Sequence, residues 1–169
     1  GQIIFDLGFF RKGIRPAVNA GLSVSRVGGQ AQTKRQKQLS TALFKALAKY
    51  HQAEEFSHFS TQLSDETRID LNRGKHLYEA LQQPPSQLLN LTEQQILLEV
   101  IMNNETDLAI DVAGIKSVLS KRALEVKTEE DFDRVEAELT TEFRAKPLEE
   151  AEQTAENAAD STEKTEAKK

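Results

Sequence analysis

The sequence contains no cysteine among its 169 residues. This absence excludes disulfide bonds and thiolate metal sites, so the fold must depend on packing, as expected for a cytosolic or matrix-facing protein. No stretch approaches the roughly 20 consecutive apolar residues of a membrane span, and none resembles a signal peptide. A chain of this length can bury a real core as one domain, or as a small domain with an extension.

Positive charge is not in excess either. The formal net charge is -5, and residues 147–169 alone hold seven acidic and three basic residues. The rest of the chain is therefore near neutral and shows no basic face, which argues against nucleic-acid binding. With a single leucine, the segment cannot bury enough apolar surface to offset the entropy of ordering, so we expect residues 147–169 to form a disordered acidic tail.

Residues 1–32 hold most of the eight glycines and short apolar alternations, as in residues 22–27. This composition is typical of strands and loops. Gly13 and the pair Gly28 and Gly29 mark places where the backbone turns tightly or is closely approached. The chain begins at Gly1 rather than at methionine, which indicates a fragment of a longer chain.

From Thr33 the apolar pattern takes a helical period and predicts a bundle over residues 33–146. We expect five amphipathic helices: the first from residue 33 to about 59, the second from about 64 to the prolines at 84 and 85, and three more that begin near 92, 112 and 128. Ser/Thr-x-x-acid or amide spacing predicts capping boxes at Thr33, Thr92 and Thr128. Gly74 is expected to be a weak point in the second helix.

Ser25 and Arg26 are unusual because they are polar residues between apolar ones in a glycine-rich, strand-like segment. An arginine in that setting is either part of a structural ion pair or a charge aimed at a phosphate. Composition alone favours the structural interpretation.

The amino-acid sequence of residues 13–34 favours the functional interpretation instead. They read Gly-Ile-Arg-Pro-Ala-Val-Asn-Ala-Gly-Leu-Ser-Val-Ser-Arg-Val-Gly-Gly-Gln-Ala-Gln-Thr-Lys, which resembles the α-subunit signature of F-type ATP synthases nearly letter for letter. A looser resemblance covers residues 1–145, including Gly-Gln-Ile at the start and Arg73-Gly74. It implies a mainly α fold: a C-terminal bundle of about five helices, preceded in residues 1–32 by a short strand-and-loop remnant of a RecA-like α/β nucleotide-binding domain.

The resemblance implies that Arg26 is an arginine finger, which reaches across the α/β interface to the γ-phosphate held by the β subunit, with Ser25 supporting it. It further implies that Arg15, Pro16 and Gln83 line the adenine pocket of the subunit's own non-catalytic nucleotide. Pro85 stands where the family has a second glutamine, and it has no amide to offer.

The sequence has no Gly-x-x-x-x-Gly-Lys-Thr loop and no acidic strand end for Mg²⁺. The resemblance therefore implies that ATP or ADP with Mg²⁺ binds the assembled complex through residues outside this chain, and that the chain alone is inactive. The implied enzyme is an H⁺- or Na⁺-transporting two-sector ATPase. Its partners would be β subunits in an α3β3 hexamer, the central-stalk γ subunit and the peripheral-stalk δ and b subunits. The implied location is the cytoplasmic face of a bacterial plasma membrane, or its organellar equivalent.

Two other functions stay open on the sequence. One is a non-catalytic helical interaction or assembly module. The other is a subunit of a related hexameric ATPase of the export or transcription-termination type, against which the α-type signature and the missing basic face count.

Two weaker signals have ordinary explanations. Lys34, Arg35 and Lys37 crowd the first turn of a predicted helix, and we expect a solvated face, with contact to an acidic partner or a phosphate as the alternative. The histidines at 51, 58 and 76 do not share the spacing of metal ligands, and no metal site is expected.

Overall fold

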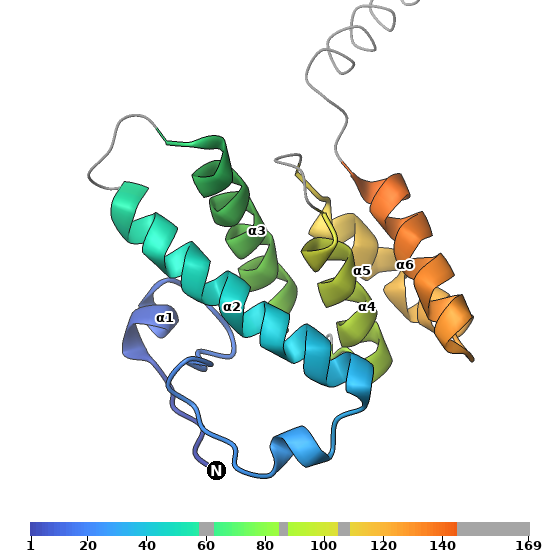
Figure 1. Ribbon diagram of the computed structural model, residues 1–169, viewed down its shortest axis with the longest axis horizontal. Helices are drawn as coiled ribbons and strands as arrows, with labels where there is room; N and C mark the ends of the chain where they lie inside the picture. The colour runs from blue at the N-terminus through green and yellow to red at the C-terminus, as the bar shows by residue number, and fades with distance from the viewer. Residues whose placement is uncertain (58–62, 85–87, 105–108, 145–169) are drawn as a thin grey trace, which may run out of the picture.

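A computed structural model of the chain describes residues 1–57, 63–84, 88–104 and 109–144, and this part is mainly helical (Figure 1). The prediction of a mainly α fold with a bundle of five helices is confirmed, since α2 to α6 form that bundle. A short 3₁₀ turn, η1, precedes it. The helices of the described residues are α1 (Leu7–Arg11), α2 (Lys34–Ser57), α3 (Asp65–Leu81), α4 (Leu91–Met102), α5 (Val112–Ala123) and α6 (Glu129–Phe143), and η1 spans Gly28–Gln30.

Two of the three predicted capping boxes are present. At the start of α2, the Thr33 hydroxyl accepts the Gln36 backbone N–H at 3.2 Å, and the Gln36 side chain accepts the Thr33 N–H at 3.0 Å. Thr128 and Asp131 exchange the same pair of bonds at the start of α6. These bonds satisfy backbone donors that have no partner within the helix, so they fix where each helix begins.

The box predicted at Thr92 is wrong. Helix α4 is capped instead by Asn90, whose side chain accepts the Glu93 N–H at 3.0 Å, while the Glu93 carboxylate accepts the Asn90 N–H at 2.7 Å. Asparagine is at least as good an N-cap as threonine, and here it begins the helix at Leu91.

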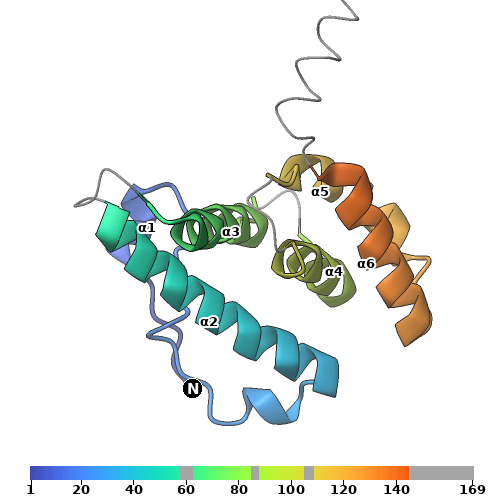
Figure 2. The same cartoon turned by 45° about the horizontal axis from the view of Figure 1, so that its top comes forward.

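The apolar stripes of the five bundle helices meet in one core, as the helical period predicts. Helix α3 packs along α2, and α4 lies between this pair and the pair formed by α5 and α6 (Figures 1 and 2). Burial of these side chains, at about 25 cal/mol per Å² of apolar surface, is the main stabilising contribution. The largest fully buried side chains are Leu77, Ile96, Leu97, Val100, Ile101, Val112, Ile115, Leu119, Val135 and Leu139.

Gly74 is not a weak point but the place where α3 meets Tyr50 of α2. A Cβ atom at position 74 would lie 2.1 Å from the Tyr50 Cδ2 atom and 2.4 Å from its Cβ atom. Any larger residue would force the two helices apart, so the glycine permits their close packing.

The N-terminal segment differs from its prediction. The described part of residues 1–32 contains no strand, only isolated antiparallel bridges between Gln2 and Val24 and between Phe5 and Val18. It also contains α1, which was not predicted. Asp6 caps this helix, because its carboxylate accepts hydrogen bonds from the backbone N–H groups of residues 8 and 9. The pKa of Asp6 is lowered, mostly by a hydrogen bond that the Asn19 side chain donates to the carboxylate and less by these two backbone bonds.

Helix α1 attaches the segment to the bundle through an aromatic cluster. The Phe9 ring stacks on His51 of α2 with centroids 6.2 Å apart and meets Tyr78 of α3 edge-on at 5.7 Å. The Tyr78 hydroxyl lies 2.8 Å from the His51 Nε2 atom, within hydrogen-bonding distance. Helix α1 is therefore fixed against α2 and α3. The part of the segment that contains η1 and leads into α2 lies at the outer edge of the molecule, below α2 in Figure 1.

None of the helices in the described ranges is long and apolar enough to cross a membrane.

Candidate functional site

Arg26 lies in an exposed loop of residues 25–32, hereafter the Arg26 loop. Among the described residues it has no hydrogen bond and no ion pair. The loop starts from a fixed point, because Val24 and Gln2 exchange backbone hydrogen bonds of 2.7 and 2.9 Å. Nothing in the described part of the chain therefore engages the Arg26 guanidinium, and it is exposed to groups of another chain.

Ser25 shapes the turn that carries Arg26. Its hydroxyl accepts the Gly28 backbone N–H at 2.9 Å. A Cβ at position 28 would lie 2.5 Å from that hydroxyl oxygen, so a larger residue there would push the Ser25 hydroxyl away from this bond. The short turn η1 then leads to Thr33 and the start of α2.

Arg15 and Gln83, which are far apart in sequence, lie side by side. The Gln83 backbone N–H donates to the Arg15 carbonyl at 3.0 Å, next to the cis bond between Arg15 and Pro16. The Gln83 side-chain oxygen accepts the Leu89 N–H at 3.2 Å. The three predicted pocket residues are therefore brought together at the end of α3, whereas Pro85 lies outside the described residues.

The Arg15 guanidinium turns back on its own segment. It lies over the Phe10 ring, 3.8 Å from the centroid, and donates to the carbonyls of Phe10 and Ile14 at 2.8 and 2.9 Å. None of the contacts among the described residues joins Arg15 or Gln83 to Arg26. The predicted residues therefore form two separate groups, one at the Arg26 loop and one at the end of α3.

The described ranges hold no group of three or more histidine, aspartate or glutamate side chains that could bind a metal ion. His51 takes part in the aromatic cluster, and burial lowers the pKa of His76. His58 lies outside the described residues.

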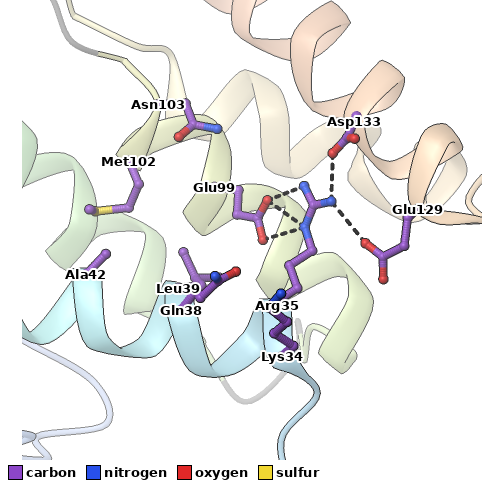
Figure 3. Close-up of a pocket in the computed structure, with 10 residues that line it drawn as sticks. All are labelled: Lys34, Arg35, Gln38, Leu39, Ala42, Glu99, Met102, Asn103, Glu129 and Asp133. Carbon is purple, nitrogen blue, oxygen red and sulfur yellow. Dashed lines mark hydrogen bonds and ion pairs between the residues drawn. The ribbon is translucent and has the colours of Figure 1, made fainter.

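Sequence reasoning missed the role of Arg35, for which we expected a solvated face. Its guanidinium instead pairs with three carboxylates of the same chain, Glu99 on α4 and Glu129 and Asp133 on α6 (Figure 3). These side chains border an open groove of about 760 Å³. The hydrogen bond to Glu99, the largest cause, raises the pKa of Arg35 above its ordinary value. Lys34 and Lys37 are exposed, as expected.

Comparisons with known proteins agree with the helical architecture. The family model for the C-terminal domain of the ATP synthase alpha/beta chain matches residues 32–168. The ATP synthase subunit alpha of Bordetella pertussis is 45% identical over 115 residues, which cover 68% of this chain and 22% of that protein. The subunit alpha of Buchnera aphidicola is 46% identical over 107 residues, which cover 63% of this chain and 21% of that protein. The sequence thus spans about a fifth of the length of these relatives.

A solved structure shares the fold. It is that of a unique ATP synthase subunit, NeqB, from Nanoarcheaum equitans, with a TM-score of 0.58 at 19% sequence identity; the match covers 62% of this chain and 28% of that one. Since the family model covers most of the sequence, the protein belongs to the family defined by the C-terminal domain of ATP synthase alpha and beta subunits.

Proposed function

We propose that this chain is the C-terminal part of the α subunit of a rotary F-type ATP synthase, and that it supplies Arg26 in trans to a nucleotide held by a β subunit. The observation that carries the proposal is the exposed and unpaired guanidinium of Arg26 in an α-type signature. The alternative explanation was a structural ion pair, and Arg26 has no such partner among the described residues.

The chemistry of such an arginine is electrostatic. Phosphoryl transfer gathers negative charge on the transferred group, and a guanidinium placed there by a neighbouring subunit stabilises that charge. In related phosphoryl-transfer enzymes, an arginine of this kind contributes on the order of 10³ to 10⁵ in rate. A guanidinium suits this role because it stays protonated at every physiological pH and can donate two parallel hydrogen bonds.

Arg15, Pro16 and Gln83 are proposed to line the adenine pocket of the α subunit's own non-catalytic nucleotide. The support is their convergence at the end of α3, where the Arg15 carbonyl and the Gln83 N–H are bonded. These residues could contact an adenine base, and they do not form a phosphate-binding loop. ATP or ADP with Mg²⁺ would therefore be held by residues outside this chain, and the nucleotide supplies the reactive phosphate.

The proposal extends to the assembly. The partners would be β subunits in an α3β3 hexamer, with the γ subunit at its centre and the δ and b subunits at its periphery. The complex would lie on the cytoplasmic face of a bacterial plasma membrane, or in an organelle, and couple ATP synthesis or hydrolysis to H⁺ or Na⁺ transport. The chain by itself is expected to be inactive.

The test is an Arg26→Ala variant of the full-length α subunit, assembled with wild-type β. We expect multisite ATP turnover to fall roughly 10³-fold or more, while nucleotide binding persists because the phosphate cradle is elsewhere. Arg11→Ala is the matched control, because Arg11 is another exposed arginine of the N-terminal segment. Turnover that stays the same in both variants would refute the finger and favour a non-catalytic assembly module.

A further inference from the structure

The Arg26 loop is tethered at both ends, and the two tethers differ in kind. At its beginning, the tether is the pair of backbone hydrogen bonds between Val24 and Gln2. At its end, the loop runs into the first turn of α2, which contains Arg35. The position of Arg26 in space depends on how firmly both ends are held.

Arg35 holds the first turn of α2 against two other helices. Its Nε and Nη2 atoms donate to the two oxygens of the Glu99 carboxylate, at distances of 2.5 to 2.9 Å. Its Nη1 atom donates to Asp133 at 2.6 Å and to Glu129 at 3.1 Å. Figure 3 shows the guanidinium between Glu99 on one side and the two carboxylates of α6 on the other.

Three features restrain this pairing. The Glu99 side chain is only 10% exposed, so its charge is poorly solvated and depends on the guanidinium. The double contact fixes the plane of the guanidinium as well as its distance. The Phe132 ring lies under that plane, 4.0 Å from the central carbon to the ring centroid.

We propose that Arg35 is a positioning residue for Arg26: its pairing with carboxylates of α4 and α6 fixes the start of α2 and thereby the end of the loop that presents Arg26. This inference rests on the proposed function of Arg26. Arg35 itself would touch neither nucleotide nor phosphate.

Loss of the Arg35 pairing should affect the turnover number and the affinity for nucleotide differently. Without the Arg35 pairing, the loop keeps its anchor at Val24, but the first turn of α2 is held less firmly against α4 and α6, and Arg26 samples a wider range of positions. Misplacement of a catalytic group lowers the turnover number, because fewer bound nucleotides meet it correctly. Affinity for the nucleotide should change little, since that is set elsewhere. Lysine at position 35 should restore only part of the function, because its ammonium keeps the charge but lacks the planar fork that pairs a guanidinium with both oxygens of one carboxylate.

The first test measures the loop directly in this protein. Since the sequence has no cysteine, a spin label on Gln30→Cys reports the Arg26 loop, and one on Gln52→Cys reports the C-terminal part of α2. We expect Arg35→Gln to raise the mobility of the label at 30 and to leave the label at 52 unchanged. Lys37→Gln, which removes a neighbouring exposed charge, should change neither label.

The second test measures turnover in the α3β3 complex with full-length α. We expect Arg35→Gln to lower kcat on the order of tenfold with little change in KM, a smaller loss than that of Arg26→Ala. Arg35→Lys should fall between wild type and Arg35→Gln. If Arg35→Gln does not fold, the double variant Glu129→Gln with Asp133→Asn removes two exposed partners and should raise loop mobility in a folded protein.

The outcomes of these tests distinguish the positioning role of Arg35 from the arginine-finger role of Arg26. Unchanged label mobility at position 30 would overturn the positioning role, whatever Arg26 does. Unchanged turnover in Arg35→Gln, with turnover lost in Arg26→Ala, would also overturn it. Unchanged turnover in both variants would overturn the proposed finger itself, and this inference with it.

Discussion

The contact between Gly74 and Tyr50 predicts that Gly74→Ala destabilises the protein, although alanine is the better helix former. Helix propensity alone would make the substitution stabilising by about 1 kcal/mol. The new Cβ, however, would lie 2.1, 2.2 and 2.4 Å from the Cδ2, Cγ and Cβ atoms of Tyr50. These distances are well inside ordinary van der Waals contact, so a side chain or a helix must move.

Several features make that movement costly. The Tyr50 Cβ atom is attached to the backbone of α2, so rotating the ring does not relieve the whole clash. The ring also packs against His51 and Tyr78, with centroids 5.5 Å away in each case. Overpacking of this kind costs about 1 to 3 kcal/mol. With a cost at the upper end of that range, the free energy of unfolding should fall by about 2 kcal/mol.

Urea unfolding followed by circular dichroism measures this change. In a Tyr50→Ala background, the penalty of Gly74→Ala should shrink by about 1 kcal/mol, because the Cγ and Cδ2 atoms are gone. Gly29→Ala is the control: nothing lies within 4 Å of its Cβ position, so it should change stability by less than about 0.5 kcal/mol. A Gly74→Ala variant more stable than wild type would refute the close-packing argument.

The packing and charges of the bundle support three further predictions. Burial is the largest cause that raises the pKa of Tyr78, and the charge of Tyr50 adds to it. In Tyr50→Phe, which removes that charge, the remaining phenolate absorbance should still appear above pH 10 in the folded protein, and stability should decline as pH rises above about 10, because the unfolded tyrosine ionises first; appearance near pH 10 would contradict burial. Glu99→Gln should cost about 2 kcal/mol in urea unfolding, whereas the equivalent change at Glu129, whose side chain is 75% exposed, should cost under about 1 kcal/mol; equal costs would contradict the buried pairing. Thr128→Ala removes the cap of α6 and should cost about 1 kcal/mol in the same assay; no loss would argue against the capping box.

Local patterns in the sequence predicted most of the helical bundle. The apolar period of the helices and the capping spacing at Thr33 and Thr128 depend on residues a few positions apart, and both were confirmed. The cap of α4 was assigned to the wrong residue because Asn90 and Thr92 both have capping spacing, and the choice between them depends on the folded protein. Helix α1 was missed because it is short and depends on a cap from Asp6 and on packing of Phe9.

Contacts between distant residues could not be predicted. Arg35 looked like one member of a solvated basic run because its partner Glu99 is 64 positions away and Asp133 is 98 positions away. Gly74 looked like a helix defect because Tyr50 is on another helix. The residues Arg15, Pro16 and Gln83 were named from the resemblance, and only the fold brings them side by side. Their roles, and that of Arg26, stay predictions.

The central claim is that Arg26 stabilises charge on a nucleotide held by another subunit. The most direct measurement is the trapping of ADP with aluminium fluoride, an analogue of the transferring phosphoryl group, by α3β3 complexes with wild-type or Arg26→Ala α. We predict that the variant binds ADP as wild type does but fails to trap the analogue, because the guanidinium acts only where the transition-state charge develops. Equal trapping by both complexes would contradict the account.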